Sequence, residues 1–206
     1  MKIKLSALAL CASLFFVSSC SSDDDDDKNV APATLQIKST DITTDALEFE
    51  WTSENGSISY EVECVKTDEE FNNDNATLVD DGTSYRYQDL LAATEYKILV
   101  IGYNAADKKC CEGTCKFTTA KVSAEFIGTW EYYHNEEVVL SYTFNEDGTG
   151  VHLNKTVKTN FKWKADDKTL TIRQIDPNKY IPGKTYDYTK TEDCLKFNKT
   201  TFLRKK

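Results

Sequence analysis

The stretch Leu140-Ser-Tyr-Thr-Phe-Asn-Glu-Asp-Gly-Thr-Gly-Val-His-Leu153 decides the fold of the second half of the chain, because its apolar and polar residues alternate on both sides of a turn. Alternation with a period of two is typical of a β-strand that buries one face. The segment Asn145-Glu-Asp-Gly148 has the residues that tight turns favour. The stretch therefore predicts a β-hairpin.

The same alternation continues on both sides of this hairpin. After a possible helical turn at Ser123–Ile127, we expect eight strands, at residues 128–134, 138–144, 149–155, 160–165, 169–174, 184–190, 194–198 and 201–205. Consecutive strands joined by short turns predict an up-and-down β-barrel, because closing the sheet removes its exposed edges. The predicted inward face carries Leu140/Tyr142/Phe144, Val151/Leu153, Phe161/Trp163, Leu170/Ile172, Tyr186/Tyr188, Leu195/Phe197 and Phe202/Arg204.

The first and last of these strands carry a pair of residues that point to a family. Gly128-Thr-Trp130 opens the first strand and Arg204 lies on the last, a pattern that resembles the lipocalin superfamily, particularly the compact lipocalin-like domains of bacterial surface lipoproteins. The resemblance implies that Trp130 packs under Arg204 as a cation–π pair at the closed end of the barrel. The aromatic residues expected either to line a ligand cavity or to fill the core are Tyr142, Phe144, Phe161, Trp163, Tyr186 and Tyr188, since eight strands leave room for either.

Residues 33–119 show the alternation of seven shorter strands, which predicts a two-sheet β-sandwich. Trp51, Tyr60 and the pattern Leu90-x-x-x-Thr94-x-Tyr96 resemble a fibronectin type III domain, and the resemblance implies that Tyr96 is the corner tyrosine. Charge separates the two halves, with 17 acidic and 7 basic residues in 32–120 but 12 and 15 in 121–206. We therefore expect a fibronectin type III-like domain at 32–120 and a barrel domain at 121–206.

The N-terminal residues indicate export. Two lysines precede a 13-residue apolar run, Leu5 to Val17, which is long enough for a signal peptide and too short to span a bilayer. Val17-Ser-Ser-Cys20 resembles the bacterial lipobox, which implies a lipoprotein signal peptide at 1–19 and lipidation of Cys20. The acidic tether at 20–31 resembles the export signal of Bacteroides-type lipoproteins, which implies an outer-membrane protein exposed at the cell surface.

Five of the seven cysteines remain after Cys11 and Cys20 are set aside. An exported protein can form disulfides, and we expect Cys115 to pair with Cys110 or Cys111 across the last hairpin of the sandwich, leaving Cys64 and Cys194 as thiols. We predict no metal site, because zinc usually takes four nitrogen or sulfur ligands and both histidines lie in the other half of the chain. No cofactor is expected.

The sequence contains no nucleophile elbow, phosphate-binding loop or metalloprotease helix. His134 and His152 are expected to be structural, with His152 facing outward. The formal charge of −9 disfavours a nucleic-acid partner. We therefore predict a non-enzymatic lipoprotein anchored to the membrane, in which the sandwich is a spacer and the barrel binds a small apolar or glycan ligand or a protein. The alternative is an interaction module with a filled barrel and recognition by its loops.

Overall fold

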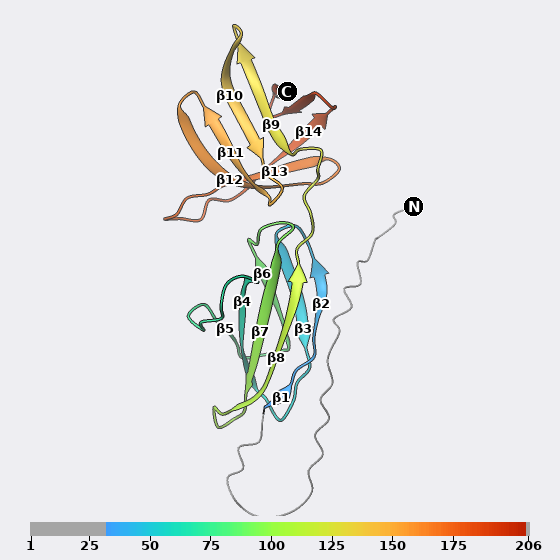
Figure 1. Cartoon of the computed structure of the whole chain (residues 1–206), viewed down its shortest axis with the longest axis vertical. Coiled ribbons are helices and arrows are strands. Elements are labelled where there is room, and N and C mark those ends of the chain that lie inside the picture. The colour runs from blue at the N-terminus through green and yellow to red at the C-terminus, as the bar shows by residue number, and fades with distance from the viewer. Residues whose placement is uncertain (1–31, 205–206) are drawn as a thin grey trace, which may run out of the picture. The chain divides into compact units, whose positions relative to one another are not determined.

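The computed structural model describes residues 32–204, and every regular element in that range is a β-strand. The chain divides into two compact units, one built by strands β1 to β8 and the other by β9 to β16 (Figure 1). The predicted signal peptide, the lipidation site Cys20 and the acidic tether lie outside the described residues. Within residues 32–204, no helix has the length and apolar character needed to cross a membrane.

The first unit is a β-sandwich, as the alternation predicts. One sheet has five strands in the order β1-β8-β7-β4-β5, and the other has three strands in the order β2-β3-β6. The strands are β1 (Ala33–Thr34), β2 (Ile37–Ile42), β3 (Ala46–Trp51), β4 (Ser59–Lys66), β5 (Thr77–Val79), β6 (Ser84–Gln88), β7 (Glu95–Tyr103) and β8 (Lys109–Thr118).

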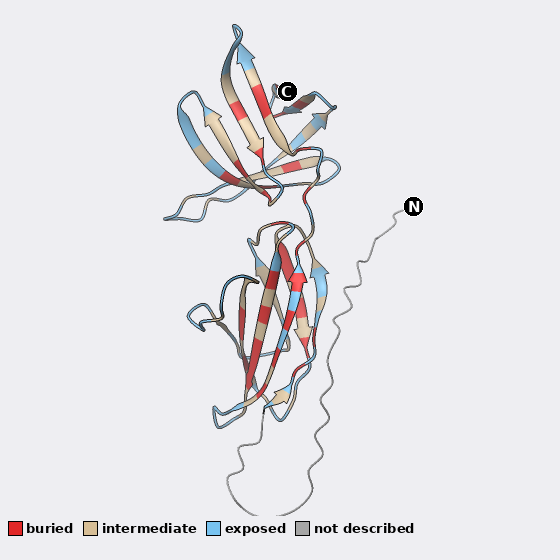
Figure 2. Cartoon of the chain, viewed as in Figure 1, coloured by how far each residue is buried: buried red, intermediate tan, exposed pale blue. Residues whose placement is uncertain are grey.

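Alternate residues of β3, β7 and β8 are buried between the two sheets, and Figure 2 shows buried residues along β7 and β8. Aromatic rings join the sheets. The ring centroids of Phe49 and Phe117 lie 6.4 Å apart, and those of Trp51 and Tyr60 lie 5.2 Å apart. Burial of such large rings supplies most of the stability of a small sandwich.

The second unit is a closed antiparallel barrel in which each strand pairs with its neighbours in sequence and β16 pairs with β9. The prediction of an eight-stranded up-and-down barrel is therefore confirmed. Its strands are β9 (Gly128–His134), β10 (Glu137–Phe144), β11 (Thr149–Asn154), β12 (Val157–Ala165), β13 (Thr169–Gln174), β14 (Lys184–Lys190), β15 (Cys194–Phe197) and β16 (Thr200–Arg204).

One predicted strand of the barrel turns the opposite face inward. Phe144 pairs with Gly150 and Tyr142 pairs with His152, so the inward residues of β11 are Gly150 and His152, whereas Val151 and Leu153 face outward. The turn is the predicted Asn145–Gly148, but the register sets Phe144 opposite Gly150 and not opposite Thr149. Within the turn, Asp147 accepts hydrogen bonds from both the backbone and the hydroxyl of Thr149. A shift of one residue exchanges the two faces of a strand.

The predicted disulfide between Cys115 and Cys110 or Cys111 is wrong. All three cysteines lie on the single strand β8, not on the two strands of a hairpin. A strand rises about 3.4 Å per residue, so Cys111 and Cys115 lie about 14 Å apart, twice the reach of a disulfide. Cys64 on β4 and Cys115 on β8 both pair with Ile98 on β7, one from each side.

Candidate functional site in the barrel

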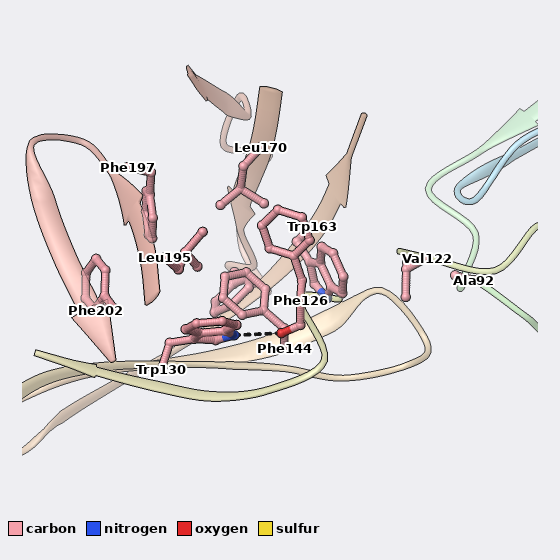
Figure 3. Packing of buried hydrophobic residues seen from close by; sticks show 11 residues of the cluster. Ala92, Val122, Phe126, Trp130, Phe144, Trp163, Leu170, Leu195, Phe197 and Phe202 are labelled. Atoms are coloured by element: carbon pink, nitrogen blue, oxygen red, sulfur yellow. Dashed lines mark hydrogen bonds between the residues drawn. The ribbon is translucent and has the colours of Figure 1, made fainter. Parts of the chain in front are cut away.

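The closed end of the barrel is built around Trp130, which is fully buried. Its indole nitrogen donates a hydrogen bond of 2.8 Å to the carbonyl oxygen of Phe126, in the turn that precedes β9. The guanidinium carbon of Arg204 lies 4.4 Å from the centroid of the Trp130 ring. The structure thus brings together the two residues that the sequence placed at the closure, and Figure 3 shows Trp130 and Phe126 joined by this hydrogen bond.

Arg204 also ties the ends of several segments together. Its guanidinium donates hydrogen bonds to the carbonyl oxygens of Ile127 (3.0 Å), Glu125 (2.6 Å) and Glu192 (3.1 Å). Hydrogen bonds from a charged donor are stronger than neutral ones. Arg204 therefore fixes the turn before β9 and the β14–β15 turn against the floor of the barrel, in addition to covering Trp130.

The interior above this floor is filled with aromatic rings. Of the predicted lining residues, Phe144, Phe161 and Trp163 are buried in the core, together with Phe126, whose ring stacks edge-on against Phe144. Tyr188 also lies at this end, because its ring centroid is 4.9 Å from that of Phe126. The closed end of the barrel is therefore a packed core. A ligand could enter only from the opposite end.

The opposite end, which we call the hairpin end, is formed by the β9–β10, β11–β12, β13–β14 and β15–β16 hairpins. The strand register turns polar residues inward here, namely His152, Thr159, Gln174, Lys184 and Thr200. His152, Thr159 and Thr200 are half-buried, whereas Gln174 and Lys184 are exposed. The inward face thus changes from aromatic and buried at the closed end to polar and accessible at the hairpin end.

Tyr142 lies where the two zones meet. Its ring centroid is 5.2 to 5.8 Å from those of Phe161, Phe197 and Phe202, and 4.3 Å from that of His152, with which it stacks at 19°. Burial, together with the nearby Tyr186, raises the pKa of the Tyr142 hydroxyl to about 12, so this group is neutral at physiological pH. Tyr142 and Tyr186 are the predicted lining residues that the structure leaves half-buried on this side.

His152 was predicted to face outward, and this prediction is wrong. Its side chain points into the barrel, because His152 pairs with the inward-facing Tyr142. Its Nε2 atom is buried and has no hydrogen-bond partner among the described residues. Burial lowers the pKa of its imidazole, so the ring is neutral at pH 7. A neutral imidazole can accept one hydrogen bond and donate another, so the buried Nε2 atom is a polar group that no described residue satisfies.

Gly150 explains how the barrel accommodates its core. A β-carbon at this position would overlap the ring of Phe161 and the backbone oxygen of Thr143. The glycine therefore lets the tip of the Phe161 ring approach the backbone of β11. A glycine inside a strand is a sequence signal for such a close approach, and it could have revealed the inward face of β11.

Comparison with known proteins identifies one of the two units. Residues 30–109 match the family model "Fibronectin type III domain", which covers strands β1 to β7 of the sandwich. This part of the chain is similar to fibronectin type III domains. No curated protein matches the sequence. Tyr96 is buried in the fibronectin type III domain, and its role as the corner tyrosine stays a prediction.

Solved structures of fibronectin type III domains are similar to the chain at low sequence identity. The domain of human collagen alpha-1(XX) chain is 18% identical, covering 50% of this chain and 93% of that chain, with a TM-score of 0.39. The domain of human contactin 1 is 20% identical, covering 52% and 90%, with a TM-score of 0.35. A two-domain segment of chicken tenascin is 15% identical, covering 73% and 95%, with a TM-score of 0.37.

Proposed function

We propose that this protein is a surface-anchored binding lipoprotein, in which the fibronectin type III domain is a spacer and the lipocalin-like barrel binds a small ligand at its hairpin end. Fibronectin type III domains typically act as non-enzymatic interaction or spacer modules, so a binding role suits both units better than a catalytic one. The ligand has an apolar face and at least one hydroxyl or other hydrogen-bonding group, a description that covers both an apolar molecule and a glycan.

The observation that carries the proposal is the surroundings of His152. Small-molecule sites are mostly aromatic or apolar, with a few polar groups that orient the ligand. Here Tyr142 and its neighbouring rings provide an aromatic floor, and the buried Nε2 of His152 provides a polar atom without a partner in residues 32–204. Leaving such an atom unpaired costs about 1–3 kcal/mol, which a ligand hydroxyl would recover.

A pair of matched substitutions tests this proposal. Leu140 faces inward beside Tyr132 and is half-buried, whereas Leu203 faces outward and is 50% exposed. Leu140→Trp fills the hairpin end, while Leu203→Trp adds the same side chain to the outside of the barrel. We expect 1-aminoanthracene, a small planar fluorescent amine, to bind the full chain and the Leu203→Trp variant, and to lose at least about tenfold in affinity for Leu140→Trp.

Equal affinity of both variants for the probe would contradict binding inside the barrel. A panel of glycans is tested on the same three proteins to learn whether the ligand is a sugar. A sugar that binds at this site must be displaced by 1-aminoanthracene. Circular dichroism of each variant checks that the fold is intact, so that a loss of binding reports on the site and not on unfolding.

The anchoring part of the proposal rests on the sequence near Cys20. The acidic run Asp23 to Asp27 after this cysteine supports export to the outer face of an outer membrane. The tether and the sandwich precede the barrel in the chain and would serve as the spacer between the lipid and the barrel. The partners are then the membrane, through the lipid, and a ligand that arrives from outside.

A second candidate function, protein recognition, is favoured by the outer surface of the barrel. Tyr133, Val138 and Leu203 are 43%, 42% and 50% exposed, and Val138 pairs directly with Tyr133 across β9 and β10. Leu203 pairs with Glu131, two residues before Tyr133, so all three side chains share one outer face. Exposed apolar patches of this kind mark interaction surfaces. Under this alternative Leu203→Trp, and not Leu140→Trp, would impair binding of the partner.

A further inference from the structure

The large apolar side chains that the barrel exposes gather at its hairpin end. Among the described barrel residues, six such side chains are exposed, namely Tyr133, Val138, Val157, Ile175, Tyr180 and Leu203. The first five lie in the turns of the hairpin end or within two residues of them. Leu203 lies toward the other end, because it pairs with Cys194, the first residue of β15. The exposed apolar surface is therefore concentrated at one end of the barrel.

The turns at the two ends of the barrel also differ in charge. The closed-end turns are residues 145–148, 166–168 and 191–193, and the hairpin-end turns are residues 135–136, 155–156, 175–183 and 198–199. The closed-end turns contain six acidic residues and one lysine, a net charge of −5. The hairpin-end turns contain two acidic residues and the exposed Lys155, Lys179 and Lys199, a net charge of +1. Apolar side chains and positive charge thus share the hairpin end.

The β13–β14 loop holds its apolar side chains in place. The backbone nitrogen of Ile175 donates a hydrogen bond of 2.9 Å to the carbonyl oxygen of Asn160 on β12. The guanidinium carbon of Arg173 lies 5.2 Å from the centroid of the Tyr180 ring. Tyr180 is nevertheless 69% exposed. Because this ring already has a partner that orders it, a surface that covers its free side would pay little side-chain entropy.

The β11–β12 hairpin presents an apolar side chain next to a positive charge in the same way. Its turn consists of Lys155 and Thr156, and Val157, which pairs with Asn154, is 65% exposed. In the β13–β14 loop, Lys179 directly precedes Tyr180. A lysine can lay its aliphatic stem along apolar surface while its ammonium group stays in a polar layer. Each of the two turns therefore combines an apolar residue with a neighbouring cation.

We propose that the hairpin end of the barrel docks on the surface of a lipid bilayer with anionic headgroups. Apolar and aromatic side chains enter the boundary between headgroups and acyl chains, and lysines bind the anionic headgroups. The same surface repels the acidic turns of the closed end, so charge orients the barrel. A protein partner would need one contiguous, complementary surface, whereas fluid lipid accommodates side chains on separate turns. Docking does not depend on the proposed ligand site, because a filled barrel presents the same turns.

The test is quenching of tryptophan fluorescence by brominated acyl chains, which reports only a tryptophan that enters the bilayer and not the insertion of an N-terminal anchor. The full chain is mixed with vesicles of phosphatidylglycerol and brominated phosphatidylcholine in equal amounts. Tyr180→Trp adds a tryptophan to the β13–β14 loop, and Leu203→Trp adds one to the outside of the barrel near the closed end. The parent chain, whose three tryptophans are buried, supplies the background. We expect the added fluorescence to fall at least about twofold for Tyr180→Trp and to stay unchanged for Leu203→Trp.

A matched pair of charge changes in the Tyr180→Trp protein completes the test. Val157→Asp adds a negative charge at the hairpin end and should abolish most of the quenching, whereas Thr189→Asp adds the same charge at an exposed position of β14 near the closed end and should leave it unchanged. Equal quenching of Tyr180→Trp and Leu203→Trp, or no quenching of either, would overturn the proposal. An effect of Val157→Asp on a protein partner without any quenching would overturn it in favour of protein recognition. None of these outcomes bears on 1-aminoanthracene, whose proposed site is inside the barrel.

Discussion

Removal of the Trp130 side chain should cost the barrel a large part of its stability. The ring is fully buried, its nitrogen donates to Phe126, and its face lies under Arg204. Truncation of a buried tryptophan typically costs about 3–5 kcal/mol. A small domain is stabilised by only about 5–15 kcal/mol in total, so Trp130→Ala should bring the barrel close to its unfolding limit.

Arg204→Ala should cost the barrel less stability than Trp130→Ala, but more than the loss of one cation–π contact. That contact is worth about 0.5–2 kcal/mol, and the guanidinium also satisfies three backbone carbonyl oxygens. We expect a loss of about 2–4 kcal/mol. Arg204→Lys should recover only part of it, because lysine keeps the charge but lacks the planar fork that reaches several acceptors at once.

Urea melts of the fragment Val122 to Lys206 measure both losses, and we predict that this fragment folds alone, since every strand of the barrel lies within it. The losses of Trp130→Ala and Arg204→Ala should be non-additive by about 1–2 kcal/mol, as for other residues in contact. Phe161→Ala, a buried change without an Arg204 contact, should add to Arg204→Ala within about 0.5 kcal/mol. Additive losses at Trp130 and Arg204, or an unfolded fragment, would refute this account of the closure.

Three other predictions concern single residues. Gly150→Ala should destabilise the barrel by about 1–3 kcal/mol in urea melts, because the new methyl group overlaps Phe161; a change below 0.5 kcal/mol would show that the ring moves freely. Burial lowers the pKa of His152, so the unfolded state binds more protons and stability should fall as the pH drops below about 6.5; His152→Gln should flatten this part of the pH profile, and an unchanged profile would contradict the burial of the ring. Cys20→Ser should release the protein from the membrane fraction on immunoblots, whereas a variant that remains there and is processed normally would exclude lipidation.

The sequence predicts the barrel well because its strands obey one rule. Each strand buries one face, so alternation marks its extent, and all eight predicted strands match observed ones to within about three residues at either end. Trp130 and Arg204 were found through the lipocalin resemblance. Their contact in space needs the closure of β16 on β9, which pairs segments more than 70 residues apart and leaves no local signal.

The errors have a shared cause, since each depends on register and not on composition. Pairing of Phe144 with Gly150, one position beyond Thr149, turns His152 inward. β8 already begins at Lys109, so Cys110, Cys111 and Cys115 lie along one strand and not across a hairpin. The hydrophobic pattern does not reveal such a register. Val151 and Leu153 are apolar and look like core residues, whereas the residues that face inward are Gly150 and His152.

The central claim, that the hairpin end of the barrel binds a small ligand, is tested most directly by the histidine ring signals in NMR spectra. The chain has two histidines, so the spectrum contains two sets of ring resonances. His152 stacks on Tyr142 inside the barrel, while His134 ends β9 in an exposed position. Titration with 1-aminoanthracene should shift the His152 resonances in a saturable way and leave those of His134 nearly unchanged. Saturable shifts at His134 alone, or none at either ring, would contradict the claim.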